Sequence, residues 1–146
     1  MENKTTQNTN EQTNSALAKF AHRITPEHIT QLNKGEFFVF GSNARGMHGG
    51  GAAAAAMKYY GAVWGQGEGL QGQSYAIPTM GTLEETEQAI QRFIQFAKVH
   101  PEMKFLVTRI GCGIAGYTPR QIAPMFASAV NVENVCLPKD FWEELV

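Results

Sequence analysis

The sequence is poor in cysteine, has no excess of one charge, and lacks an apolar run long enough to cross a membrane. Its two cysteines, Cys112 and Cys136, do not suggest a disulfide framework, so we expect reduced thiols in a cytoplasmic protein. The 12 Lys and Arg residues are balanced by 13 Asp and Glu residues, which argues against broad electrostatic binding to nucleic acid. The N-terminus lacks the basic-then-apolar pattern of a secretory signal.

Metal-binding and familiar nucleotide-binding motifs are also missing. The histidines do not show the H-x-x-x-H kind of ligand spacing; they are His22, His28, His48 and His100. The glycine-rich stretch after residue 40 lacks the Gly-Lys-Ser/Thr ending of a Walker A loop. It also differs from the Rossmann G-x-G-x-x-G motif with an acidic residue at the next strand end. We therefore predict neither a metal site nor a bound cofactor.

What the chain does contain is glycine, with 15 residues, many of them in two clusters that each follow an apolar run. The first run, 37–40, leads into a loop over 41–51, and the second run, 105–110, leads into a loop over 111–117. Short apolar runs without polar alternation are typical of strands covered on both faces. Five consecutive alanines predict a helix over 52–60 directly after the first loop.

The remaining elements predict an α/β domain. Residues 1–15 are polar and are predicted to be a disordered tail, and 16–146 are predicted to form a single domain. The pattern predicts a helix from Thr25 to Gly35, a turn or hairpin in 62–73, a strand over 74–77, a helix from Thr82 to about His100, a helix from Thr118 to about Val130, a strand over 134–137 and a closing helical turn over 141–146. This alternation favours a mostly parallel sheet with helices on its faces.

Both glycine loops leave strands at their carboxyl ends, where proteins of this class bind ligands, so both can point into one cleft. Backbone N–H groups in a glycine loop that precedes a helix form an anion site, usually for phosphate. The alternative is that the loops are plain turns. The candidate ligand-binding residues are Gly41, Ser42, Asn43, Gly49, Gly50, Gly51 and Ala52 in the first loop, and Gly111, Cys112, Gly113, Ile114, Ala115, Gly116 and Tyr117 in the second.

Four side chains near these loops carry chemistry. The amide of Asn43 can bind a ribose hydroxyl or hold a water, or it can serve a left-handed turn. His48 is a candidate acid–base or phosphate contact, or an ordinary loop histidine. Cys112 fits a small apolar loop residue better than a thiolate, because no base lies near it in sequence. Tyr117 is a candidate to stack on a base or ribose, while Phe40, Trp64 and Tyr75 are expected to belong to the core.

These motifs resemble those of the macro-domain family. Residues 38–51, with Asn43 followed by Gly49-Gly50-Gly51, resemble the family's strand that ends in Asn and leads to a Gly-Gly-Gly loop. Residues 110–117 are similar to its second loop, typically Ser/Thr-Gly-Ile-Tyr/Phe-Gly-Tyr/Phe. Residues 74–78 fall where the family has a strand ending in an Ile-His-x-x-Gly-Pro type of sequence. The resemblance covers the order of motifs from Phe37 to Leu137.

The resemblance implies a three-layer α/β/α fold with a mixed, mostly parallel sheet, and a domain that binds ADP-ribose or a related NAD-derived nucleotide. It implies that Asn43 contacts the distal ribose and that the two loops hold the diphosphate and that ribose. Some members hydrolyse ADP-ribosyl links, which would make Asn43 and His48 candidate catalytic residues and an ADP-ribosylated protein a partner. Other members only bind, so a non-catalytic nucleotide sensor stays open, as does an interaction module without a small ligand.

The chain also departs from the family. Gly41-Ser42-Asn43 replaces the usual Asn-Ala-Ala-Asn, so the first Asn is missing. Glu36 is a weak match to the family's adenine-binding Asp. Alanines follow the first loop where poly-ADP-ribose glycohydrolases carry an acidic pair. The sequence therefore predicts a divergent and compact relative of the family.

Overall fold

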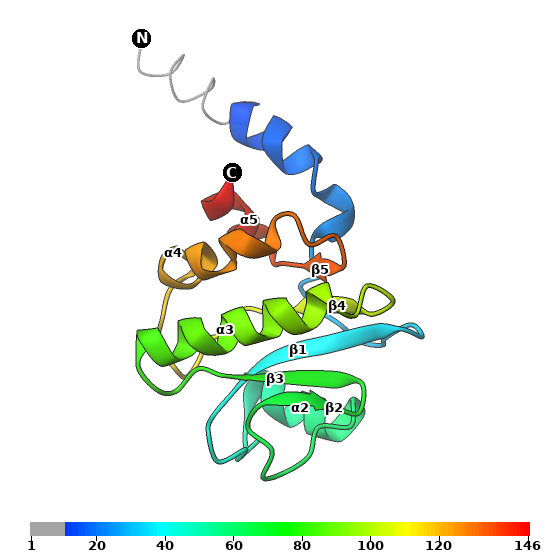
Figure 1. Ribbon diagram of the computed structural model, residues 1–146, viewed down its shortest axis with the longest axis vertical. Coiled ribbons are helices and arrows are strands. Elements are labelled where there is room, and N and C mark those ends of the chain that lie inside the picture. The colour runs from blue at the N-terminus through cyan, green and yellow to red at the C-terminus, as the bar shows by residue number, and fades with distance from the viewer. Residues whose placement is uncertain (1–10) are drawn as a thin grey trace.

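The computed structural model describes residues 11–146, and a mixed five-stranded sheet lies at its centre (Figure 1). Its strands are β1 (Glu36–Ser42), β2 (Gly69–Gln71), β3 (Ser74–Pro78), β4 (Lys104–Val107) and β5 (Val135–Cys136). They are arranged in the order β2-β3-β1-β4-β5. Strands β3, β1, β4 and β5 are parallel, and β2 pairs antiparallel with β3. The prediction of a mixed, mostly parallel sheet is confirmed. The turn or hairpin predicted within 62–73 is a hairpin that extends beyond this range, because β2 pairs with β3.

Helices cover both faces of this sheet. Figure 1 shows α2 (Gly51–Tyr59) on one side, and α3 (Leu83–Lys98), α4 (Pro119–Ile122) and α5 (Lys139–Leu145) on the other. The short 3-10 helix η2 (Ala123–Ala129) follows α4 and packs against α3 and α5. The predicted arrangement of helices on both faces is therefore present, and the fold is a three-layer α/β/α arrangement.

Strand β1 contributes side chains to two separate hydrophobic cores, because successive side chains of a strand point to opposite faces of the sheet. Phe38 and Phe40 pack on the α2 side, where Ala53 and Ala56 face them. Val39 packs on the opposite side, in the larger core beneath α3. The small alanine side chains allow α2 to lie close to β1, which places the start of α2 beside the end of β1.

Helix α3 forms as its sequence predicts. The Thr82 side chain accepts a hydrogen bond from the Glu85 N–H at 3.1 Å and caps the first turn. The buried residues recur at helical spacing, and they are Thr86, Ala89, Ile90, Phe93, Ile94 and Ala97. The helix thereby covers the face of the sheet opposite α2.

The predicted single helix from Thr118 to about Val130 is instead two segments. The Thr118–Gln121 capping box is present at the start of α4. Pro124 then follows at the beginning of η2, where it contributes no N–H to a helical ladder. The chain continues as a 3-10 helix to Ala129, so the predicted path is kept but its hydrogen-bond pattern changes.

The predicted helix from Thr25 to Gly35 is wrong. Ile24 forms a parallel bridge with Leu137, and the Thr25 N–H donates to the Leu137 carbonyl at 2.9 Å. Further along, the Tyr60 hydroxyl donates to the Ile29 carbonyl at 3.2 Å, and the Gln73 amide donates to the Asn33 carbonyl at 3.0 Å. Partners distant in sequence thus bind the backbone of this segment, so tertiary contacts override the local start signal.

Arg23, which ends the 3-10 helix η1 (Ala21–Arg23), fixes this N-terminal segment to the C-terminal part of the chain. Its buried guanidinium donates to four backbone carbonyls, those of Ala129, Val130, Val132 and Val135. It also lies 4.9 Å from the centre of the Trp142 ring. Burial lowers the Arg23 pKa from its ordinary value, the charge of Glu133 partly offsets this shift, and the four carbonyls compensate for the lost hydration.

The predicted disordered tail differs from the structure in part. Residues 11–18 are helical, and Leu17 from this helix joins the larger core. Burial of that leucine gives the segment a reason for order that its polar composition does not indicate. The remainder of the predicted tail, residues 1–10, lies outside the described residues.

Candidate functional site

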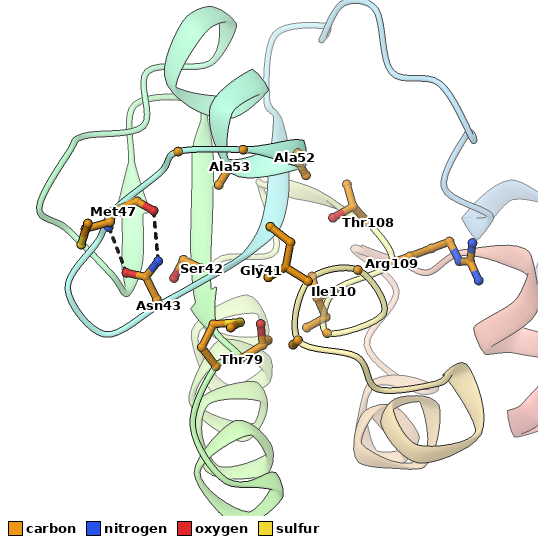
Figure 2. Close-up of a pocket in the computed structure, with 18 residues that line it drawn as sticks. Gly41, Ser42, Asn43, Met47, Ala52, Ala53, Thr79, Thr108, Arg109 and Ile110 are labelled. Carbon is orange, nitrogen blue, oxygen red and sulfur yellow. Dashed lines mark hydrogen bonds between the residues drawn. The ribbon is translucent and has the colours of Figure 1, made fainter.

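A cavity of about 250 Å³ lies at the carboxyl ends of three adjacent strands, β3, β1 and β4, beside the N-terminus of α2 (Figure 2). Both glycine loops contribute to its wall, as the sequence predicts. The predicted residues that line it are Gly41, Ser42, Asn43, Gly49, Gly50, Gly51 and Ala52 from the first loop, and Gly111, Gly113, Ile114 and Ala115 from the second.

Asn43 closes a tight turn at the start of the first loop. Its Oδ1 accepts from the Met47 N–H at 2.9 Å, and its Nδ2 donates to the Met47 carbonyl at 3.0 Å (Figure 2). The Gly46 N–H adds a bond to the Asn43 carbonyl at 3.0 Å. Because an amide has two N–H groups and two acceptor lone pairs, Asn43 keeps one of each for a ligand.

The segment before β2 supports this turn from behind. The Ser42 hydroxyl donates to the Gly67 carbonyl, and the Gly65 N–H donates to the Gly46 carbonyl at 2.9 Å. Gly46 has a φ of +68°, and a Cβ there would overlap the backbone of Gln66. A Cβ at Gly67 would overlap the carbonyl oxygen of Asn43. The glycines at this contact are therefore required by backbone packing.

The glycines at the other end of the first loop have a different environment. Among the residues that the structure describes, a Cβ at Gly49 or Gly51 would meet no atom within 4 Å, and the same holds for Gly113 in the second loop. At Gly50 the nearest atom would be the Ile114 Cδ1 at 4.0 Å. Packing against the described residues therefore does not require the small size of these glycines, and only Gly51 has a left-handed φ, +57°, that favours glycine by itself. The space beside them belongs to the cavity.

The N-terminus of α2 opens into the same space. Gly50 is its N-cap and has no side chain to accept a hydrogen bond. The first intrahelical bond runs from the Ala54 N–H to the Gly50 carbonyl, at 3.2 Å. The N–H groups of Gly51, Ala52 and Ala53 therefore lack helical acceptors, and these residues line the cavity. Together with the positive end of the helix dipole, they favour a negatively charged group.

His48 lies outside the cavity, contrary to its prediction as an acid–base or phosphate contact. It is 2 % exposed, and its Nε2 lies 3.3 Å from the Gln71 Oε1. Its ring packs edge-on against Phe40 at a centroid distance of 5.2 Å. The loop turns this side chain inward because a flat ring fills the space between Phe40 and Gln71, so the structure gives His48 a packing role.

Three predicted residues of the second loop also fall outside the lining: Cys112, Gly116 and Tyr117. The Tyr117 hydroxyl donates to the Gly81 carbonyl at 3.0 Å, which ties this loop to the connection between β3 and α3 instead of leaving the ring to stack on a ligand. Cys112 is half-buried, and burial raises the pKa of its thiol. This agrees with a small loop residue and not with a reactive thiolate.

Several lining residues were not predicted: Met47, Ala53, Thr79, Met80, Thr108, Arg109 and Ile110. Thr79 and Met80 follow β3, and Thr108 follows β4. Applying the strand-end rule to every parallel strand would have found them, because β3 and β4 both flank β1. Arg109 carries no sequence signal, and its guanidinium points away from the cavity to Asp140 (Figure 2).

The lining offers little chemistry for acid–base catalysis. Among the described residues that form it, none is an Asp, Glu, His, Cys, Lys or Tyr. Backbone N–H groups, the Thr79 hydroxyl and the Asn43 amide supply its hydrogen-bond donors, whereas the Ser42 and Thr108 hydroxyls already donate to the Gly67 and Val39 carbonyls. Within residues 11–146, no three His, Cys, Asp or Glu side chains gather as a metal site would need. The arrangement is suited to holding an anion by its oxygens.

The part of the chain that the structure describes holds no helix that is both long and apolar enough to cross a membrane. Comparison of the sequence with protein-family models and with curated proteins, and of the structure with solved structures, finds no match.

Proposed function

We propose that this chain binds ADP-ribose or a related NAD-derived nucleotide in the cavity between the two glycine loops. The observation that carries the proposal is the open space beside Gly49, Gly50 and Gly113, where a Cβ would meet no atom of residues 11–146 closer than 4.0 Å and where φ is not positive. A diphosphate fits this space because it can approach the backbone N–H groups at the start of α2 without meeting side chains. The distal ribose would then lie near Asn43, as the macro-domain resemblance implies.

The size of the cavity supports a division of the ligand. Pockets that enclose a whole drug-sized ligand measure roughly 300–1,000 Å³, and this one measures about 250 Å³. It therefore suits the ribose-diphosphate portion, with the base at the mouth. Three apolar side chains line the cavity and are exposed, namely Met47 at 50 %, Met80 at 50 % and Ile114 at 82 %. These side chains offer contact to the flat face of a base.

Titration calorimetry with ADP-ribose and with NAD tests this proposal. Gly50→Val places a branched side chain in the cavity, and Gly50 has an extended backbone with φ −157°, which valine adopts without strain. We expect wild-type protein to bind and Gly50→Val to lose at least about tenfold in affinity, because phosphate approach is obstructed. Ala127→Val is the control, since Ala127 is exposed on η2 outside the cavity. A folded wild-type protein that produces no heat with either nucleotide would refute the proposal.

Binding without hydrolysis is the second candidate function, and the composition of the lining favours it. A cavity without a carboxylate, imidazole or thiol provides no general base of its own, so hydrolysis would need the ligand's phosphate to activate water. Mass spectrometry of ADP-ribose after long incubation with the protein should recover the nucleotide intact. Release of ADP-ribose from a modified protein, abolished by Asn43→Ala in a folded variant, would instead establish hydrolysis.

A further inference from the structure

Arg109 is the single charged residue among the described residues that line the cavity. It directly follows Thr108, whose hydroxyl is held by the Val39 carbonyl at 2.7 Å, so its backbone is fixed at the end of β4. The side chain runs outward from the cavity (Figure 2). Its guanidinium nitrogen lies 2.9 Å from the Asp140 carboxylate on α5. A positive charge is therefore anchored at the cavity but turned away from it.

We propose that Arg109 exchanges Asp140 for the phosphate groups of the bound ligand. This inference rests on the proposed function, and it identifies a residue that selects for ligand charge. The guanidinium has a planar fork of N–H donors that matches phosphate oxygens as well as it matches a carboxylate. In the bound state, Arg109 neutralises the negative charge that the backbone N–H groups at the start of α2 only partly compensate.

The exposure of the ion pair keeps the free-energy cost of this exchange small. The Arg109 side chain is 62 % exposed and the Asp140 side chain 35 % exposed, and ion pairs in such solvent contact contribute little to stability. The arginine side chain has several rotatable bonds, so rotation about them redirects the guanidinium while the backbone stays in place. Asp140 lies in the first turn of α5, where the helix dipole favours its charge after Arg109 leaves.

Asp140 then acts as a competitor for the cation that the ligand needs. Removing the charge of Asp140 should free Arg109 and tighten binding, whereas removing Arg109 should weaken it. A purely structural ion pair predicts otherwise, because each substitution would then affect only the packing of α5. The two substitutions therefore distinguish the roles.

Calorimetry on the full chain tests the exchange with two probes, ADP-ribose and inorganic pyrophosphate, for wild type, Arg109→Gln, Asp140→Asn and the double variant. We expect Arg109→Gln to weaken both probes roughly tenfold, as loss of a charge-assisted contact does. Asp140→Asn should strengthen them about threefold, the smaller effect of removing a screened competitor. The double variant should behave like Arg109→Gln. Circular dichroism and thermal melting confirm that each variant is folded.

If wild type binds the probes and Arg109→Gln binds them equally tightly, the exchange is overturned while the proposed function stands. Weaker binding in both single variants would also overturn it, because the intact ion pair would then be what the site needs. If wild type binds pyrophosphate but not ADP-ribose, the proposed nucleotide fails and the role of Arg109 is decided on pyrophosphate. If wild type binds neither probe, both ideas fail.

Discussion

Glycine occurs at both ends of the first glycine loop, but its surroundings differ between the two ends. Around residues 43–47 the loop is a closed turn, in which Asn43 bonds both backbone groups of Met47 and Gly46 presses against Gln66. Around residues 49–51 the loop is open, and a Cβ would meet at most one distant methyl group. Glycine at the closed end is explained by the fold. At the open end the left-handed φ of +57° accounts for Gly51, whereas glycine at positions 49 and 50 needs an explanation outside the fold.

This contrast assigns stability to one end of the loop and ligand binding to the other. A closed turn fixes where the cavity begins, and an open stretch leaves backbone N–H groups accessible beside the start of α2. Substitutions at the two ends should therefore separate in what they change. The experiments that follow test this separation.

Gly46→Ala should have the largest effect, and on stability. The new Cβ would require the left-handed φ of +68° and would overlap the backbone of Gln66. Strain and overpacking together should lower the free energy of unfolding by about 3–5 kcal/mol. Urea denaturation followed by circular dichroism measures it. A variant as stable as wild type would show that the turn is not held as described.

Gly113→Val should affect binding and leave stability alone. This residue lines the cavity from the second loop, and no atom of residues 11–146 lies within 4 Å of the position a Cβ would take. We expect a loss of at least about tenfold in affinity for ADP-ribose, since the side chain would occupy the place of the ligand. Calorimetry measures the affinity, and a melting curve on the same sample measures the stability. A lower melting temperature together with unchanged affinity would reverse the assignment.

Asn43→Ala should affect both properties, lowering the free energy of unfolding and the affinity for ADP-ribose. It removes both side-chain bonds to Met47, which should cost about 1–2 kcal/mol of unfolding free energy. It also removes the free N–H and lone pair offered to the distal ribose, so the affinity for ADP-ribose should fall. Denaturation and calorimetry measure the two effects separately. A loss of stability with full affinity would make Asn43 a turn residue alone.

The smallest expected effect is that of pH on binding. None of the described lining residues is an Asp, Glu, His, Cys, Lys or Tyr, so the lining supplies no group with an ordinary pKa between about pH 7 and about pH 8.5. Burial raises the pKa of the Cys112 thiol, which lies outside the lining. The affinity for ADP-ribose should therefore change less than about twofold over this range. Calorimetry at several pH values checks this. A steep dependence would show that a titrating group outside the lining, such as the thiol of Cys112, reaches the ligand.

The fold was predictable where local signals and burial agree. Apolar runs gave β1 and β3, and the Thr82 and Thr118 caps marked true helix starts. The signal at Thr25 is of the same kind but failed, because the chain there pairs with Leu137 and supplies carbonyls to distant side chains. A cap motif cannot reveal such long-range partners. The same applies to residues 11–18, whose helix is joined to the core through Leu17.

The location of the site was predictable from the sequence, whereas the orientation of its side chains was not. Glycine loops after strands located the cavity, since the carboxyl ends of parallel strands meet at one edge. The sequence did not reveal that His48 turns inward toward Gln71 or that Tyr117 bonds Gly81. Nor did it reveal that the Arg109 side chain turns to Asp140, because this pairing joins segments 31 residues apart in sequence. The orientation of a side chain depends on tertiary packing, and the spacing of residues in the sequence does not encode that packing.

The most direct test of the central claim is a titration of ¹⁵N-labelled protein with ADP-ribose, followed through the backbone amide signals. We predict large shifts for the amides of Gly50, Gly51 and Ala52 at the start of α2, and for Gly113 in the second loop. The amides of Gly46 and Gly67, which are packed within the closed turn, should stay nearly unchanged. Absence of shifts at Gly50 and Gly51, or shifts concentrated at Gly46 and Gly67, would contradict the account.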